Sequence, residues 1–474
     1  MPNLKLQGVQ VNNCSFVRGL LSTLMLLTCS SLVFAEGPDL IQDRLKSNRN
    51  SQISFMAAPL HGSAPTITYQ SDLALIPASL MKLLTSYVAL KQLGRDFRFE
   101  IRMQLGVKDA RGIAALTVWA PLGMPDLVIE DLYLVARRIK ALGLNGLSKL
   151  VVIQDPRFLD NKDWPEAYQA KTSSLSINYN SIGTELCPSS ESNNMKALLD
   201  LPELPNEIIG QVSSAIKDQK KPLSVNLEFQ NSANIWQVQL SGYLPKTADC
   251  QLVYKAIPSA EYAFAPTLAK LLQQQGLVVE AYETKIEEPR VAAEASDIIF
   301  NSRPLSDILM RMNRFSSNFI ARSLALALQY QKKSNSLEGS GVGLVEAALK
   351  QEYAEAASLK VHDASGLARE NRVSAALLVR LLRSASKDPE IGVELQSSLV
   401  YSKLGTLRNR DFGASAESLR VKTGFINGVS GLAGFLTVKS GETWAFAIIQ
   451  NGVKSRERAL KFEEELIEEF YNRF

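Results

Sequence analysis

Histidine is nearly absent from this chain, which has only His61 and His362 among 474 residues. A histidine-rich metal site is therefore excluded, and a Ser-His-Asp triad would have to use one of these two side chains. An excess of one charge is also lacking, since 52 Lys and Arg stand against 48 Asp and Glu. No basic stripe interleaved with aromatic residues indicates a nucleic-acid surface. The sequence has no Gly-x-Ser-x-Gly motif, which argues against an α/β-hydrolase esterase.

The first 35 residues contain no acidic residue and have an apolar run from Leu20 to Phe34. A basic start, a short apolar run and small residues before Glu36 are typical of a secretory signal peptide, whereas a membrane span needs about 20 apolar residues. We therefore expect residues 1–35 to be a cleaved signal peptide. The mature protein would then be periplasmic or extracellular, with no stable membrane span; a retained anchor helix is the alternative.

Cysteine is scarce too, because only Cys187 and Cys250 follow the expected leader. An even pair in an exported protein predicts a disulfide that closes a loop of about 60 residues. Two unpaired thiols are the alternative, since spacing alone does not show proximity.

What is present suits ordinary folded protein, with 46% hydrophobic and 21% charged residues. At about 100 to 200 residues per domain, the length predicts two to four folded units. Residues 99–289 read as short strands and polar loops and are interpreted as an inserted module. The other expected elements are strands at 52–58 and 66–70 around a turn at 61–63, helices at 79–93, 305–312, 318–331 and 374–385, a hairpin of 432–438 and 444–450, and a helix from about 455.

The expected terminal helix carries apolar residues among five glutamates. Anionic lipid would repel so acidic a polar face, which argues against a membrane-surface anchor. We expect the apolar face to pack on the sheet formed by the hairpin.

The strongest local pattern lies at the start of the helix expected at 79–93, where Ser79 and Lys82 are three residues apart. This spacing puts both on one helix face, so the Lys82 amine can approach the Ser79 hydroxyl. Serine is a weak nucleophile until a neighbour takes its proton, and a lysine of lowered pKa can do this without histidine. An isolated match is more often a capping serine and a solvated lysine, so the rest of the sequence must decide.

Two further motifs supply that context. Ser316-Ser317-Asn318 stands between two expected helices, and Lys422-Thr423-Gly424 ends a strand-like segment. Each alone is an ordinary capping or turn sequence. Together with Ser-x-x-Lys, and in this order, they form the motif set of active-site-serine penicillin-binding enzymes.

With these motifs the chain resembles the D-alanyl-D-alanine carboxypeptidase/endopeptidases of the penicillin-binding protein type 4 group, over nearly the whole mature sequence. The 237 positions from Ser79 to Ser316 fit this group, in which two extra subdomains interrupt a transpeptidase-like domain. Further segments that fit are Leu93–Phe99, Trp164-Pro165, Leu175–Asn180, Asp363–Asn371, Gly405–Arg408 and Gly431–Phe435.

The resemblance implies an α/β (α+β) fold, with a penicillin-binding transpeptidase-like and β-lactamase-like catalytic domain in which helices flank a sheet. This domain would comprise residues 36–98 and 294–474. A large β-rich insertion of two subdomains would separate them, the first from 99–180 and 255–293 and the inner one from 181–254.

The resemblance also implies the catalytic roles. Ser79 would attack the carbonyl between two D-alanines of a peptidoglycan stem peptide or cross-link, with Lys82 accepting its proton. Ser316 would relay a proton to the leaving amine. A nearby Lys422 cation would disfavour protonation of Lys82. β-Lactams would trap Ser79 covalently and act as inhibitors.

The implied substrate-binding residues are Asn318, which would hold the substrate amide, and Lys422 with Thr423, which would bind the terminal carboxylate. Gly424 and Phe425 continue the same strand. The backbone N–H of Phe425, with that of the nucleophile, would form the oxyanion hole.

Three departures from the family pattern bear on this interpretation. Ser317 stands where many relatives have aspartate, which removes a charge but keeps both functional positions. Phe425 replaces the small or hydroxylated residue usual after Lys-Thr-Gly, so a hydrogen bond to the carboxylate is expected to be missing. We hypothesise weaker carboxypeptidase than cross-link endopeptidase activity. Residues 164–174 also diverge, so no specificity residue is inferred there.

No metal or organic cofactor is implied, and no nucleic-acid partner is expected. His362 beside Asp363 could be read as part of a triad, but Lys82 already supplies a base. The first alternative to an enzyme is a non-catalytic peptidoglycan-binding protein that keeps the fold. The second is a β-lactamase-like hydrolase, for which no motif identifies a deacylating carboxylate.

Overall fold

The structure is a computed structural model, which describes residues 36–474 except 49–50, 62–63, 161–164, 190–191, 216–217 and 332–340. The expected signal peptide, residues 1–35, lies outside the described residues, as do Trp164 and most of the turn expected at 61–63. In the part of the chain that is described, no helix combines the length and apolarity that a membrane crossing requires.

The expected catalytic domain is built on a five-stranded antiparallel sheet with the order β15-β16-β17-β1-β2. Strands from early and late in the chain therefore lie side by side at its centre. The expected strands at 52–58 and 66–70 and the expected hairpin are confirmed. The strands are β1 (Gln52–Pro59), β2 (Ile67–Tyr69), β15 (Leu419–Ile426), β16 (Val429–Thr437) and β17 (Thr443–Asn451).

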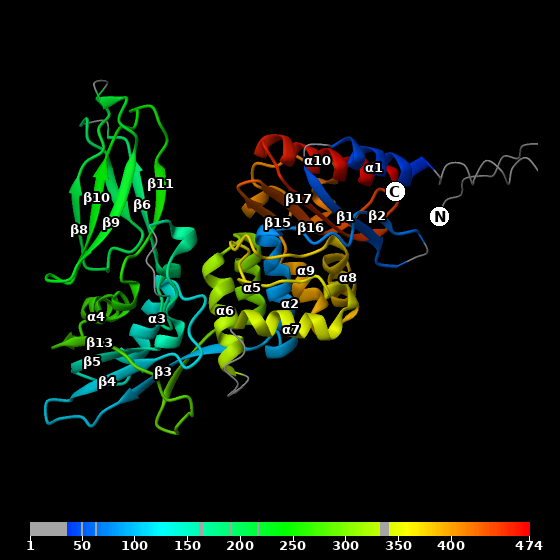
Figure 1. The fold of residues 1–474 in the computed structure, drawn as a ribbon. Coiled ribbons are helices and arrows are strands. Elements are labelled where there is room, and N and C mark those ends of the chain that lie inside the picture. Colours follow the sequence, from blue (N-terminus) through cyan, green and yellow to red (C-terminus); the bar gives the residue numbers. More distant parts are fainter. Residues whose placement is uncertain are drawn as a thin grey trace, which may run out of the picture.

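Helices cover both faces of this sheet (Figure 1). Because successive strand residues point to opposite faces, Ala445 and Ala447 belong to the large core shared with most helices, whereas Trp444 and Phe446 pack toward α1 and α10. The expected helices in this domain are confirmed. The helices are α1 (Glu36–Ser47), α2 (Met81–Leu93), α5 (Leu305–Arg314), α6 (Asn318–Gln331), α7 (Gly341–Glu352), α8 (Ala375–Lys387), α9 (Gly392–Ser398) and α10 (Arg456–Arg473).

The terminal helix α10 packs on the sheet, as its apolar stripe predicted. Leu466, Ile467 and Phe470 are buried in one cluster with Trp444 of β17. The Phe470 and Trp444 rings meet edge to face, with centroids 5.1 Å apart. The apolar face of α10 is therefore part of the core.

The insert, which we define as the segment from β3 to β14, begins with a six-stranded sheet. β14 pairs with β3 in this sheet, so strand pairing carries the insert to Pro304, beyond the boundary expected at residue 293. The strands are β3 (Arg98–Leu105), β4 (Ile113–Trp119), β5 (Gly146–Gln154), β12 (Val278–Val279), β13 (Tyr282–Ile286) and β14 (Ile298–Pro304).

The expectation of only strands and loops between 99 and 289 is wrong at two places. The insert contains α3 (Ile129–Lys140) and α4 (Phe264–Gln274), which contact each other, and α4 also contacts β5. The buried residues of α3 are Leu132, Val135, Ala136 and Ile139. That spacing is the stripe by which one face of a helix packs on a sheet.

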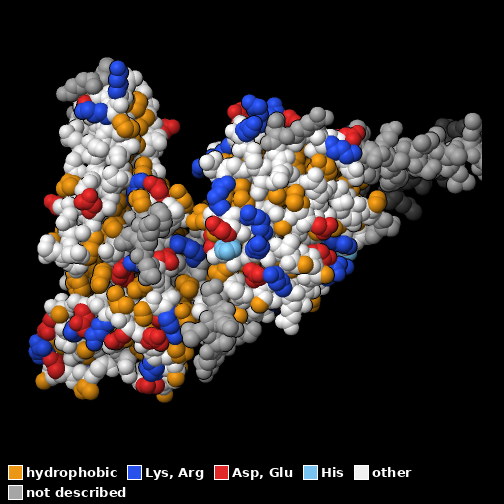
Figure 2. Space-filling model, in the orientation of Figure 1, with side chains coloured by type: hydrophobic (Ala, Val, Ile, Leu, Met, Phe, Trp, Pro, Cys, Tyr) orange, Lys and Arg blue, Asp and Glu red, His pale blue; other side chains and the backbone are white. Residues whose placement is uncertain are grey.

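The inner part of the insert consists of two three-stranded sheets, and Figure 2 shows it as a column with open space between it and the catalytic domain. The expected pairing of Cys187 with Cys250 is confirmed, and this disulfide joins the end of β6 to the start of β11. The strands are β6 (Ser181–Cys187), β7 (Lys196–Leu199), β8 (Asn206–Gly210), β9 (Ser224–Gln230), β10 (Ile235–Ser241) and β11 (Gln251–Ala256).

Candidate active site

Ser79 lies in a short 3-10 helix, Ala78–Leu80, that leads directly into α2. The residue before it, Ala78, has a φ of 47°, a backbone angle that residues other than glycine rarely adopt. Gly366 lies against this turn, because a Cβ atom at position 366 would overlap the Ala78 carbonyl and lie 3.0 Å from the Ser79 nitrogen. The turn that carries Ser79 is thus held by a glycine from a distant loop.

Lys82 lies one helical turn after Ser79 and is completely buried. Its Nζ is 3.0 Å from Ser79 Oγ, 2.7 Å from Asn318 Oδ1 and 2.6 Å from the Ser365 carbonyl oxygen. Burial, followed by the charge of Lys422, holds the pKa of Lys82 well below its usual range. A neutral amine is therefore accessible next to the serine hydroxyl.

Ser316 lies between α5 and α6 and has a φ of 56°. Lys422 on β15 donates to Ser316 Oγ at 3.0 Å and to the Thr423 carbonyl at 2.7 Å. Burial lowers the pKa of Lys422 to about 7. The second serine, Ser316, is thus hydrogen-bonded to a second buried lysine, Lys422.

Asn318 connects Lys82 to the insert. Its Oδ1 accepts from Lys82, and its Nδ2 donates to the Tyr168 carbonyl oxygen of the insert at 2.9 Å. One side-chain amide therefore links the Lys82 amine to the backbone of the insert.

The Lys-Thr-Gly strand β15 passes close to the turn that carries Ser79. A Cβ atom at Gly424 would lie 2.8 Å from the Pro77 carbonyl oxygen and 3.3 Å from the Leu80 nitrogen, so only glycine allows this approach. Phe425 is 38% exposed, and the Arg456 guanidinium lies 4.6 Å from its ring centre. All the residues predicted from the three motifs are thus brought to one site or to the strand that borders it.

Sequence reasoning missed the role of the loop that begins at Asp363. The Asp363 carboxylate accepts from the backbone N–H groups of Ser365, Gly366 and Ala368. These bonds hold the Ser365 carbonyl oxygen at hydrogen-bond distance from Lys82 Nζ. They also hold Gly366 against the turn that carries Ser79. The Asp-x-Ser-Gly sequence was a signal of the family, but the sequence did not show what the loop contacts.

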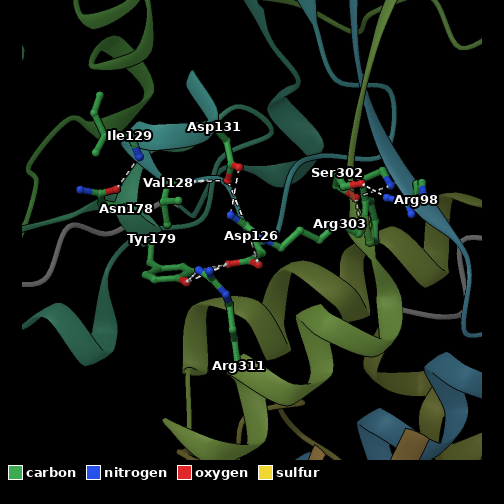
Figure 3. Close-up of polar contacts among 11 residues, drawn as sticks. Arg98, Asp126, Val128, Ile129, Asp131, Asn178, Tyr179, Ser302, Arg303 and Arg311 are labelled. Atoms are coloured by element: carbon green, nitrogen blue, oxygen red, sulfur yellow. Dashed lines mark hydrogen bonds and ion pairs between the residues drawn. The ribbon is translucent and has the colours of Figure 1, made fainter. Parts of the chain in front are cut away.

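An ionic network that is partly buried ties the insert to α5, as Figure 3 shows. Asp126 of the insert is 2% exposed and accepts from Tyr179 Oη at 2.8 Å. Arg311 of α5 donates to Tyr179 Oη at 3.3 Å and lies 3.6 Å from Asp126 Oδ1. Arg303 pairs with Asp126 at 3.5 Å and with Asp131 at 3.0 Å. We call these five residues the junction network.

A cavity of about 300 Å³ opens beside the junction network and reaches Ser316 and Asn318. Its lining includes Tyr168, Tyr254 and Phe315. Of the three motifs, Ser316-Ser317-Asn318 therefore borders an aromatic recess that the insert also lines.

Comparison with known proteins agrees with this geometry. The sequence model of the D-Ala-D-Ala carboxypeptidase 3 (S13) family matches residues 39–471. The chain is 28% identical over 408 residues to a D-alanyl-D-alanine carboxypeptidase of Actinomadura sp. (strain R39), a match that covers 80% of this chain and 73% of the relative. It is 23% identical over 453 residues to D-alanyl-D-alanine carboxypeptidase DacB of Haemophilus influenzae, covering 90% and 92% of the two chains.

Among solved structures, penicillin-binding protein 4 from Haemophilus influenzae superposes with a TM-score of 0.72 at 23% identity, over 91% of this chain and 99% of that one. This likeness confirms the predicted fold class. The family match confirms the prediction of a serine peptidase of the D-Ala-D-Ala carboxypeptidase class. The chain belongs to the D-Ala-D-Ala carboxypeptidase 3 (S13) family.

Proposed function

We propose that this family member hydrolyses the D-Ala–D-Ala bond of peptidoglycan stem peptides, and the equivalent bond of cross-links, through an acyl-enzyme on Ser79. The observation that carries this proposal is the buried Lys82 Nζ at 3.0 Å from Ser79 Oγ. A lysine of lowered pKa at hydrogen-bond distance from a serine has the geometry of a nucleophile and its base.

In the proposed acylation, Ser79 Oγ attacks the carbonyl carbon while its proton passes to Lys82 Nζ. Backbone N–H groups of Ser79 and Phe425 receive the developing oxyanion. The C–N bond then breaks, and the leaving amine takes the hydroxyl proton of Ser316. Ser316 regains a proton from the Lys422 ammonium, which lies 3.0 Å away.

Deacylation uses the same groups. The oxygen of a water molecule bonds to the acyl carbon, and the water proton passes through Ser316 to the neutral Lys422 amine. The ester bond to Ser79 Oγ then breaks, and Lys82 returns its proton to Ser79. In the bound substrate, Asn318 holds the amide, and Lys422 with Thr423 holds the terminal carboxylate. Asn318 is supported in this role by its two fixed hydrogen bonds.

A fluorescent penicillin tests the acyl-enzyme. We expect covalent labelling of the full mature protein and none of Ser79→Ala. Ser440→Ala, in the exposed tip of the β16–β17 hairpin, is the matched control and keeps the label. An unlabelled wild type, or a labelled Ser79→Ala, would show that the protein is a binder or uses another nucleophile.

Products identified by mass test the substrate. A muropeptide with a pentapeptide stem is expected to lose one D-alanine, and a cross-linked dimer to give monomers. Faster cleavage of the dimer supports the hypothesis, based on Phe425, that carboxypeptidase activity is the weaker one. Equal or faster cleavage of the pentapeptide overturns it.

We propose further that the protein acts in the periplasm or outside the cell. The basic, apolar leader supports this, and the Cys187–Cys250 disulfide fits an oxidising compartment. The mass of the protein recovered from an expressing cell tests it, since cleavage after Ala35 leaves Glu36 as the first residue. An uncleaved chain in the cytoplasm would contradict the proposal.

A further inference from the structure

The segment Gly405–Arg408 has no role in the mechanism above, yet it contacts the Lys-Thr-Gly strand. Thr423 Oγ1 donates a hydrogen bond to Thr406 Oγ1 at 2.8 Å. Both side chains are partly exposed, so the pair lies at the surface that substrate reaches. This is a direct side-chain contact to a residue that the proposed function assigns to the carboxylate.

Thr406 is held in place from two sides. Val400, before it, exchanges two backbone hydrogen bonds of 2.9 Å with Val421 of β15, which lays the segment along the strand edge. Gly405 has a φ of 46°, and a Cβ atom there would overlap the Arg314 carbonyl oxygen. The segment therefore lies between β15 and the C-terminal end of α5, which is two residues before Ser316.

Proton counting shows what Thr406 can do. A threonine hydroxyl has one proton to donate, and a carboxylate has only acceptors. To bind a carboxylate, Thr423 must turn its proton away from Thr406. Its oxygen then needs a donor, and the Thr406 hydroxyl can become that donor. Phe425, the next residue on the same face of β15, has no hydroxyl to offer.

We propose that Thr406 is a positioning residue for carboxylate recognition. On substrate binding, the hydroxyl pair reverses so that Thr406 donates to Thr423 and Thr423 donates to the terminal carboxylate. Such a chain strengthens the outer hydrogen bond because each hydroxyl polarises the next. The proposal rests on the proposed function and adds a determinant of specificity for a free carboxyl end.

Two peptides that differ only at the end separate this role from a structural one. One ends in D-Ala-D-Ala with a free carboxylate and the other in D-Ala-D-Ala-amide. An amide end can donate to Thr423, which then needs no reversal. In Thr406→Val, we expect kcat/KM for the carboxylate peptide to fall about three- to tenfold, mainly through KM, and that for the amide to change less than about twofold.

The matched control is Thr443→Val, which breaks a similar hydroxyl pair, Thr437 with Thr443 at 2.9 Å, on β16 and β17. It should leave the carboxylate-to-amide ratio unchanged, and Thr406→Ser should keep the wild-type ratio. Thr406→Ala serves as a second variant without the hydroxyl if the valine disturbs folding.

The proposed role of Thr406 would be overturned if Thr406→Val lost equal kcat/KM on both peptides. It would also be overturned if the carboxylate-to-amide ratio stayed unchanged in both Thr406→Val and Thr406→Ala. These results differ from failure of the proposed function, in which the wild type itself cleaves neither peptide and takes no penicillin. A carboxylate-to-amide ratio of kcat/KM that falls below the wild-type value in Thr406→Ser would also count against the proposal, because serine retains the hydroxyl.

Discussion

At the scale of single residues, unusual backbone conformations gather at the two serines. Ala78 precedes Ser79 with a φ of 47°, and Ser316 has a φ of 56°. Such conformations cost about 1–3 kcal/mol each and persist only where the surroundings hold them. Gly366 holds the first turn and Lys422 the second. The backbone at the two serines is therefore supported by contacts from distant segments.

Gly366→Ala tests this support. The Cβ atom would collide with the Ala78 carbonyl, so we expect penicillin acylation of Ser79 to fall about 10- to 100-fold from displacement of the nucleophile. Gly441→Ala is the matched control, because its φ of 91° equals that of Gly366 within a degree but no atom lies within 4 Å of its Cβ. The backbone conformation alone costs each variant about 1–2 kcal/mol in thermal unfolding, and the collision destabilises Gly366→Ala further. Similar acylation rates for the two would contradict the contact.

The charge on Lys422 determines a pH dependence. This cation lowers the pKa of Lys82, after burial, so removing it lets the pKa of Lys82 rise. The protonated fraction of the base then increases at any given pH. We expect Lys422→Gln to slow acylation and to shift the acid limb of its pH profile to higher pH.

Second-order acylation rates measured from acid to alkaline pH check this shift. Lys439→Gln, which removes an exposed lysine from the end of the same sheet, serves as the control and keeps the wild-type limb. An unmoved limb in Lys422→Gln would mean that burial alone sets the pKa of Lys82.

At the scale of elements, α10 joins the sheet through polar as well as apolar contacts. Glu463 is fully buried, and it accepts from Ser430 Oγ at 2.6 Å and from Gln450 Nε2 at 3.0 Å. Arg410, from the loop before β15, pairs with it at 3.2 Å. Burial raises the pKa of Glu463, and the Arg410 charge opposes that rise. One carboxylate thus joins the helix, two strands and a loop.

Arg410→Leu leaves this carboxylate without its cation. We expect the free energy of unfolding in urea to fall by about 3–5 kcal/mol. Tryptophan fluorescence reports the transition, because Trp444 lies in the apolar cluster that α10 buries. The pKa of Glu463 rises further, so the folded state binds more protons than the unfolded one above pH 4.5, and stability falls as pH rises from there.

Two controls define the effect. The double variant Arg410→Leu/Glu463→Leu should recover most of the loss, because no buried charge remains. Arg473→Leu removes the exposed pair with Glu469 and should cost less than about 0.5 kcal/mol. A double variant as unstable as the single one would show that packing of the arginine dominates.

At the scale of the whole molecule, the insert contacts the candidate active site. The Tyr168 carbonyl fixes Asn318, and the junction network fixes the insert against α5 one turn before Ser316. Asp126 is central to this network, because both Arg303 and Arg311 face it. The docking of the insert should therefore affect acylation of a serine that the insert does not contain.

Asp126→Asn removes the buried charge of the junction network. We expect faster hydrogen exchange in residues 124–132 and 305–320 and a fall in acylation of about three- to tenfold, from looser placement of Asn318. Asp109→Asn, which loses an exposed pair with Arg111 elsewhere in the insert, is the control and changes neither. Unchanged exchange in Asp126→Asn would show that apolar packing alone holds the junction.

Much of the fold was predictable because its elements have regular patterns. The α6 helix begins and ends as expected, and the terminal hairpin follows from two apolar runs around Ser440-Gly441-Glu442. The α3 helix was missed although its stripe is regular, because the short strands around it dominated the interpretation of that region. No strand was predicted at β14, and the boundary of the insert was expected at residue 293. The pairing of β14 with β3, about 200 residues away, could not be seen because local pattern does not show pairing.

The sequence by itself determined which chemical groups are available: a serine and a lysine one helical turn apart, a second serine with an asparagine, and a Lys-Thr-Gly strand. Only the tertiary structure decided their protonation and their neighbours. The pKa of Lys82 is lowered because burial and Lys422, 340 positions later, make its charge costly. Likewise, Thr406, Tyr168 and Ser365 join the site through contacts across the fold, because burial and proximity depend on how distant segments pack.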